Sequence, residues 1–253
     1  MRGGAALRAS DRPVVCISQA RLGSMRLPGK VMLPVLGRPL LYWHLSRLRR
    51  ARRIDQLVVA TTVEHRDDAI VELCHSMGIA VFRGAEADVL SRYAGAATSF
   101  GAATVVRVTS DCPLIDQALV DDVIAAYGAE RPDIDYAALE PADYPRGLDT
   151  EVFSAEALAK AQAAATDPAE REHVTLHLYR RPDSFRIRRL SGNEALGRFR
   201  WCVDEPADYE LIRRMIEALA PRHPDFTWRD CLALLAEQPS WVEINHAVVQ
   251  KTV

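Results

Sequence analysis

Short apolar runs alternate with helical segments along the first half of the 253-residue chain, and this alternation most constrains its fold. The runs are rich in β-branched residues, which is typical of buried strands. Strands are expected at residues 14–17, 57–62, 79–82 and 104–108. Helices are expected at residues 39–50, 66–77 and 88–100. Such alternation at short spacing predicts an α/β fold with a parallel sheet covered by helices on both faces.

The second half of the chain predicts a less regular arrangement. Asp116 is expected to cap a helix that runs to about residue 127, and Ser154 is expected to cap another that runs to about residue 165. Residues 131–150 are rich in Pro, Asp and Gly, so we expect loops that reach over the site. Further helices are expected at 168–179 and 206–219, and strands at 185–190 and 199–203. In the first half of the chain, an extended piece is expected at 31–36.

No repeat or low-complexity linker divides the chain. Residues 13–253 are therefore interpreted as one domain with an excursion at about 131–200, preceded by a frayed segment at 1–12. No apolar run approaches about 18 residues and none is typical of a signal peptide, so we expect a cytoplasmic protein without membrane contact. The five cysteines lack zinc-ligand spacing and are interpreted as reduced thiols.

The net charge of −2 does not predict nucleic-acid binding, but the charges are unevenly distributed. Residues 1–53 contain twelve basic side chains and one acidic side chain, whereas residues 111–156 contain twelve acidic and two basic ones. One interpretation is that the basic end binds a polyanion while some of the acids hold a cation. The other is that both regions are solvated faces, and charge alone does not decide between them.

Residues 19–30, Gln-Ala-Arg-Leu-Gly-Ser-Met-Arg-Leu-Pro-Gly-Lys, follow the first expected strand and combine glycine with cations. Arg21, Arg26 and Lys30 can pair with phosphate or carboxylate oxygens, and the glycines permit close backbone approach. The two glycines are separated by five residues, so neither the P-loop nor the Gly-x-Gly-x-x-Gly spacing fits. Only three of the 32 basic residues are lysines, which suggests that a compact ammonium is needed at Lys30.

Two acids follow expected strands. Asp111 comes after the strand at 104–108, and Asp204 comes after the strand at 199–203. Open α/β sheets bind ligands at the carboxyl ends of their strands, and carboxylates are ligands that Mg²⁺ prefers. Each acid can also be interpreted as the cap of the helix that follows it.

Several motifs occur together in the chain. They are the loop at 19–30, Val58-Val59-Ala60-Thr61-Thr62, Phe82-Arg83-Gly84, the segment 107–116, Pro145-Arg146-Gly147-Leu148-Asp149 and Arg171-Glu172-His173. With these motifs, over about residues 13–215, the chain resembles the cytidylyltransferase family of the spore-coat polysaccharide protein SpsF, which is related to the KDO and acylneuraminate cytidylyltransferases. The resemblance implies a Rossmann-like, GT-A-like nucleotidyltransferase fold with a mostly parallel mixed sheet, and a homodimer.

The resemblance also implies transfer of CMP from CTP to a sugar acid, with Mg²⁺ as cofactor and release of pyrophosphate. Arg21, Lys30 and Asp111 are the implied catalytic residues, and Asp111 and Asp204 the implied metal ligands. The residues expected on the nucleotide side are Gln19, Ala20, Arg21, Gly23, Ser24, Arg26, Lys30, Thr61, Thr62 and Arg83.

Arg146, Asp149 and His173 are candidates for contact with the acceptor. Arg146 could pair with an acceptor carboxylate or form a structural ion pair, and Asp149 or His173 could assist as a base. The acceptor itself stays open, because the sequence matches neither the KDO nor the acylneuraminate enzymes clearly.

Two other functions are compatible with the residues. A glycosyltransferase on a similar fold would need an Asp-x-Asp metal motif, and Asp133-Ile134-Asp135 has this spacing outside the matched strand end. A non-catalytic nucleotide-binding subunit would bind CTP without turnover.

Overall fold

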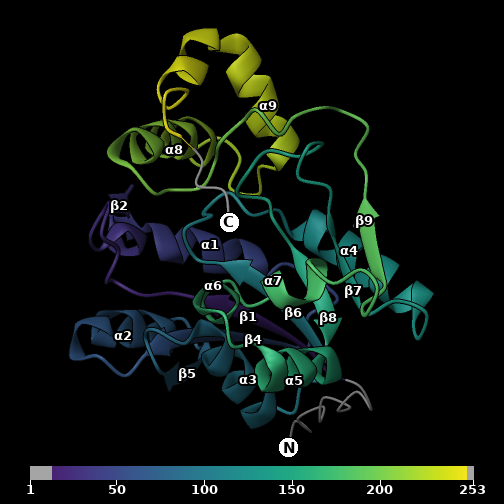
Figure 1. Ribbon diagram of the computed structural model, residues 1–253. Coiled ribbons are helices and arrows are strands. Elements are labelled where there is room, and N and C mark those ends of the chain that lie inside the picture. The colour runs from purple at the N-terminus through teal and green to yellow at the C-terminus, as the bar shows by residue number, and fades with distance from the viewer. Residues whose placement is uncertain (1–12, 250–253) are drawn as a thin grey trace, which may run out of the picture.

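The computed structural model describes residues 13–249, so the frayed segment expected at 1–12 lies outside the described residues. A seven-stranded sheet in the order β5-β4-β1-β6-β8-β7-β9 runs through the molecule, and helices pack on both of its faces (Figure 1). Between residues 13 and 249, no helix has both the length and the apolar character needed to cross a membrane.

Four parallel strands form one half of the sheet, at the positions that the sequence predicted. They are β5 (Ala80–Gly84), β4 (Gln56–Thr62), β1 (Val14–Gln19) and β6 (Thr104–Thr109). β1 pairs in parallel with both β4 and β6. The carboxyl ends of these strands therefore lie at one edge of the sheet, where β1 leads into residues 20–30 and β6 into residues 110–116.

The other half of the sheet contains β8 (Glu151–Ser154), β7 (Tyr136–Leu139) and β9 (Ile187–Leu190). β8 pairs antiparallel with β6 and β7, whereas β9 pairs in parallel with β7, so β8 alone reverses direction and the sheet is mostly parallel but mixed. The sequence predicted only β9 of these three. The expectation of loops throughout 131–150 is wrong at β7, whose four residues are all buried between strands distant in sequence.

The helices divide between the two faces of the sheet. α1 (Leu40–Leu48), α2 (Asp68–Ser76) and α4 (Gln117–Glu130) cover one face, and α3 (Val89–Ser99) and α5 (Ala155–Ala164) cover the other. Alternating side chains of β1 explain the division. Val15 and Ile17 pack with α3 and α5, whereas Cys16 packs with α1 and α4. Asp116 and Ser154 cap α4 and α5 as expected.

The C-terminal helices form a further layer over α1 and α4 (Figure 1). They are α8 (Pro206–Leu219), α9 (Trp228–Glu237) and the 3-10 helix η3 (Pro239–Glu243). The strand expected at 199–203 is wrong, because only Arg200 forms a single bridge, with Arg146. This segment is extended but does not join the sheet.

Two other segments differ from the expected elements. The helix expected at 168–179 is divided into α6 (Pro168–Glu172) and α7 (Leu176–Tyr179), because Val174 between them has a φ of 24°. The extended piece expected at 31–36 begins instead as the 3-10 turn η1 (Lys30–Met32). The short strand β2 (Pro34–Val35) follows and pairs with β3 (Arg38–Pro39). A further 3-10 turn, η2 (His65–Asp67), follows β4.

Candidate active site

The loop at residues 20–30 is held against the end of β4 by a buried acid. Asp67 accepts a hydrogen bond from the Leu22 N–H at 2.8 Å. At the other end of the loop, Gly29 has a left-handed φ of 69°, and its N–H donates to the Leu22 carbonyl at 3.0 Å. A side chain would be strained in this conformation, so glycine closes the loop and Lys30 follows at the start of η1.

A buried histidine holds the turn that carries Asp111. Nδ1 of His44 lies 2.8 Å from the Cys112 carbonyl oxygen, and Nε2 lies 2.8 Å from Ser18 Oγ. Ser18 Oγ lies 2.7 Å from Ser110 Oγ. A neutral His44 that donates from Nδ1 satisfies both of its contacts, because Nε2 then accepts from a hydroxyl. The network therefore joins α1 and β1 to the turn on both sides of Asp111.

This histidine predicts a pH dependence of stability. Burial lowers the pKa of His44 from 6.5 to about 4, so its contribution to stability is complete above about pH 6.5. That contribution falls by about 3 kcal/mol as the pH decreases to about 4, because the unfolded chain takes up a proton that the folded protein does not.

The His44→Gln variant cannot take up this proton but can keep both hydrogen bonds. We expect its free energy of unfolding to change less than that of the wild-type protein between about pH 7 and about pH 4.5. Chemical denaturation at both pH values measures the difference, and the carboxylates are common to both proteins. Equal changes in the two proteins would contradict the prediction.

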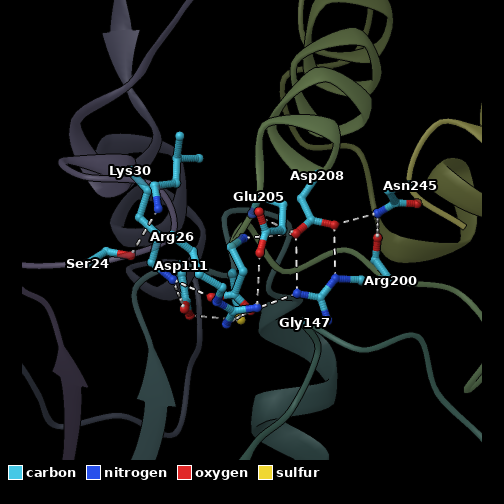
Figure 2. A network of polar contacts seen from close by, with 12 residues as sticks. Ser24, Arg26, Lys30, Asp111, Gly147, Arg200, Glu205, Asp208 and Asn245 are labelled. Carbon is cyan, nitrogen blue, oxygen red and sulfur yellow. Dashed lines mark hydrogen bonds and ion pairs between the residues drawn. The ribbon is translucent and has the colours of Figure 1, made fainter. Parts of the chain in front are cut away.

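The ammonium of Lys30 lies between two carboxylates from distant parts of the chain (Figure 2). Nζ is 2.6 Å from Asp111 Oδ2 and 2.7 Å from Asp204 Oδ1. Burial alone would lower the pKa of Lys30, but the two carboxylates outweigh burial and raise this pKa above its ordinary value. Burial would likewise raise the pKa of Asp111, but Lys30 outweighs it and lowers the pKa to about 2. The pKa of Asp204 is lowered because Lys30 outweighs burial there too.

Asp204 reaches this position from the segment before α8. The backbone N–H of Val203 donates to the Asp111 carbonyl at 2.8 Å, so the two segments lie side by side. The sequence predicted that Asp111 and Asp204 converge, and the structure brings them together on Lys30. The expected reason is wrong for Asp204, which follows an extended loop outside the sheet rather than the end of a strand.

A second network holds the other oxygen of Asp204, and the sequence did not indicate it. Figure 2 shows its members Arg200, Asp208 and Asn245 beside one another. Arg200 Nη2 donates to Asp204 Oδ2 at 2.7 Å, and Arg200 Nε donates to Asp208 Oδ1 at 2.9 Å. The buried Asp208 also accepts the N–H groups of Asp204 and Glu205. Asn245 Nδ2 donates to Asp208 Oδ1 and to the Arg200 carbonyl. The run Asp-Glu-Pro-Ala-Asp predicted a helix start, but only the fold shows that its last acid holds an arginine.

The two arginines of the loop have different partners. Arg26 Nη2 lies 3.0 Å from Asp204 Oδ2, so Arg26 joins the cations around this carboxylate. Arg21 lies instead 3.9 Å from Glu86 and 3.8 Å from Glu172. The structure thus brings Arg26 and Lys30, but not Arg21, to the paired carboxylates.

The other loop residues expected on the nucleotide side surround the end of β1. Gln19 is the last residue of β1, and its Oε1 accepts a hydrogen bond from Arg107 at 3.5 Å. Ala20 is buried, and the Ser24 hydroxyl accepts a backbone N–H within the loop at 3.4 Å. A Cβ on Gly23 would lie 2.5 Å from a carboxylate oxygen of Glu86, so the Glu86 side chain would have to shift to admit a larger residue here.

The three candidates at the ends of β4 and β5 donate within the chain. Thr61 and Thr62 are buried, and both hydroxyls donate to Asp67. Arg83 donates to Asp68 at 2.6 Å and to two backbone carbonyls. These contacts hold the loop and η2 in place, and they do not include the paired carboxylates.

The acceptor candidates lie on two segments, Arg146 and Asp149 in the loop before β8 and His173 after α6. The backbone of Arg146 forms hydrogen bonds with the residues that precede and follow Arg200. The Nε atom of Arg146 is buried without a hydrogen-bond partner. Its side chain forms no ion pair with an acid in the described part of the chain. Asp149 is exposed, and its Oδ2 accepts the Gly147 N–H at 2.9 Å. His173 is half-buried, and burial lowers its pKa.

Other possible metal ligands are sparse. Asp133 and Asp135 form their ion pairs with Arg186, at 3.8 and 3.4 Å, rather than joining the paired carboxylates. Across residues 13–249, no group of three or more His, Cys, Asp or Glu side chains could hold a metal ion. A cation at Asp111 and Asp204 would therefore need further ligands from substrate or water.

The parallel strand ends, the glycine-containing cationic loop and the paired carboxylates define a protein of the nucleotidyltransferase class. Comparison with known proteins identifies the family. Residues 15–226 match the sequence model of the family described as Cytidylyltransferase, so the chain belongs to the cytidylyltransferase family of enzymes.

Individual relatives agree with this family. The chain is 31% identical over 233 residues to the spore coat polysaccharide biosynthesis protein SpsF of Bacillus subtilis, covering 89% of this chain and 95% of the relative. It is 34% identical over 130 residues to the 3-deoxy-manno-octulosonate cytidylyltransferase of Geobacter sulfurreducens, covering half of each chain. The solved structure of a cytidylyltransferase from Leptospira borgpetersenii is similar with a TM-score of 0.88 at 29% identity, covering 96% of this chain and 99% of that one.

Proposed function

We propose that this protein transfers CMP from CTP to a sugar acid, KDO-like or nonulosonate-like, with release of pyrophosphate, in the biosynthesis of a polysaccharide or glycoconjugate. The observation that carries the proposal is the convergence of Lys30, Asp111 and Asp204 beside the cationic loop. Family membership supports cytidylyl transfer. The names of the relatives, a polysaccharide biosynthesis protein and a KDO cytidylyltransferase, support the acceptor class and the pathway.

Mg²⁺ is the proposed cofactor, and Asp111 and Asp204 are the residues that would hold it. Asp111 Oδ2 and Asp204 Oδ1 both face the position of the Lys30 ammonium. Two carboxylates with phosphates and waters form a ligand set that fits Mg²⁺. When bound, the ion supplies charge neutralisation at the phosphates and increases the acidity of the acceptor hydroxyl.

The loop cations are proposed to bind the triphosphate. CTP carries about four negative charges, which repel an approaching oxygen nucleophile unless cations neutralise them. Lys30 and Arg26 are already charged and lie beside the paired carboxylates, so each can exchange a carboxylate contact for a phosphate oxygen. Arg21 is proposed to contact the nucleotide from the other side of the loop, and a homodimer is proposed as the assembly.

The acceptor side is proposed to include Arg146, Asp149 and His173. The buried Nε of Arg146 has no hydrogen-bond partner, which suits pairing with the carboxylate of a sugar acid. The lowered pKa of His173 keeps its imidazole neutral at neutral pH, as a base requires.

Pyrophosphate release tests the proposed function. We expect the protein with Mg²⁺ to release pyrophosphate from CTP only when a sugar acid is added, and faster from CTP than from ATP, GTP or UTP. A panel of eight- and nine-carbon keto-acids and neutral sugars of the same size measures the acceptor class. No release with any acceptor, together with no CTP-dependent thermal shift, would overturn the proposal.

Two outcomes of the same assay would favour other functions. Tight CTP binding without turnover by any acceptor would indicate a non-catalytic subunit. Tighter binding of intact nucleotide sugars than of CTP would indicate a glycosyltransferase.

A further inference from the structure

The two oxygens of Asp204 have different surroundings. Oδ1 faces the Lys30 ammonium at 2.7 Å, together with Asp111 Oδ2 at 2.6 Å. Oδ2 faces away from this position and contacts Arg200 Nη2 at 2.7 Å and Arg26 Nη2 at 3.0 Å. Asp204 therefore presents one oxygen to the proposed metal position, while the guanidinium groups of Arg200 and Arg26 hold the other.

The second oxygen of Asp111 also has a contact within the protein. The thiol of Cys112 lies 3.5 Å from Asp111 Oδ1, on the side away from Lys30. The thiol is a weak donor, so this contact restrains Asp111 less than the guanidinium groups restrain Asp204. The stronger restraint on the number of protein oxygens is therefore at Asp204.

Arg200 is suited to be the permanent partner of Asp204. Its side chain is 8% exposed, whereas that of Arg26 is 30% exposed and lies on the loop proposed to bind phosphate. The Arg200 fork is fixed by the buried Asp208, which accepts from Nε at 2.9 Å and from Nη2 at 3.2 Å. Asn245 donates to both Asp208 and the Arg200 backbone, which fixes the pair to the C-terminal layer.

The geometry points to Arg200 as a specificity-determining residue that makes this site select Mg²⁺ over Ca²⁺. The inference rests on the proposed function and deepens it at the same site. Mg²⁺ binds single oxygens in near-octahedral geometry and keeps its waters, whereas Ca²⁺ takes six to eight oxygens and often binds both oxygens of a carboxylate. With Oδ2 held by Arg200, Asp204 can offer only Oδ1. Asp204 therefore provides a one-oxygen carboxylate, which suits the smaller ion.

Removal of the guanidinium tests the inference. In Arg200→Gln the amide can still donate to Asp208 but is too short to reach Asp204 as well. The double variant Arg200→Gln, Asp208→Asn removes the buried carboxylate along with its partner, so it also avoids an unpaired buried charge. In both, Asp204 Oδ2 is free of this restraint and can join Oδ1 in binding a larger ion.

Mg²⁺ and Ca²⁺ each compete with Mn²⁺ for the site, and electron paramagnetic resonance measures the concentration of free Mn²⁺ during the competition. The full-length protein is held in excess over CTP without acceptor, so no turnover is needed and little free nucleotide binds metal. We expect the ratio of Ca²⁺ to Mg²⁺ affinity to increase about tenfold in both variants. Arg200→Lys, which keeps the charge, should restore part of the wild-type ratio.

Arg47→Lys is the matched control, because Arg47 is a buried arginine that donates to two backbone carbonyls elsewhere in the fold. It should lose stability and keep the wild-type ratio. Equal weakening of Mg²⁺ and Ca²⁺ binding in the Arg200 variants would overturn the selectivity role alone. If the wild-type protein together with CTP bound no more Mn²⁺ than CTP alone, this result would overturn both the proposed metal site and its selectivity.

Discussion

Replacing Asp111 by asparagine is expected to slow pyrophosphate release about 10³-fold at the CTP and Mg²⁺ concentrations that saturate the wild-type protein. Asparagine has nearly the same size and keeps an oxygen near Lys30, so the change removes charge rather than contact. One of the two oxygens proposed for Mg²⁺ then belongs to a neutral group, and the ion binds more weakly. Initial rates measured over a range of Mg²⁺ concentrations should show that more metal restores part of the activity.

Asp122→Asn provides a control for the Asp111 variant. Asp122 is an exposed acid on α4, so its replacement changes the net charge equally without altering the site. Its rate should equal that of the wild-type protein. If Asp111→Asn had the rate and the Mg²⁺ dependence of the wild-type protein, Asp111 would not be a ligand of the proposed metal. If the variant lost CTP binding in the absence of metal, Asp111 would contribute to nucleotide binding instead.

The parts of the fold that sequence predicted depend on local signals. The four parallel strands are runs of β-branched residues, and the caps at Asp116 and Ser154 are side chains that bond to N–H groups two or three residues ahead. The short strands β7 and β8 have no such signal, because each is stabilised by pairing with strands far along the chain. Their burial decides their conformation, and burial is a property of the whole fold.

The same distinction applies to the candidate site. Lys30 and Asp111 stand in recognisable positions, a glycine-containing loop and a strand end, so sequence indicated both. Arg200 stands in a segment without a motif, and its importance arises from Asp204 and Asp208, at the start of α8, and from Asn245, which reaches it from a segment distant in sequence. Conversely, Arg83 belongs to a motif, but the fold directs its guanidinium to Asp68 and backbone carbonyls.

Replacing Lys30 by methionine is expected to have two effects of opposite sign. Turnover should fall about 10²-fold, because a charged hydrogen bond to the triphosphate is worth up to about 3 kcal/mol. In the nucleotide-free protein, by contrast, affinity for Mn²⁺ should rise about tenfold, since the ammonium no longer lies between Asp111 and Asp204. The two carboxylates then face each other without the ammonium between them, and a divalent cation relieves their repulsion.

The opposite signs separate this explanation from simple damage to the site, which would lower both quantities. Titration of Mn²⁺ without CTP, followed by electron paramagnetic resonance, measures the affinity, and pyrophosphate release measures turnover. Lys160→Met is the control, because Lys160 is an exposed lysine on α5 and its replacement should change neither. If Mn²⁺ bound no more tightly to Lys30→Met than to the wild-type protein, the ammonium would not occupy the metal position. The two carboxylates would then act in the folded protein as the partners of Lys30 rather than as metal ligands.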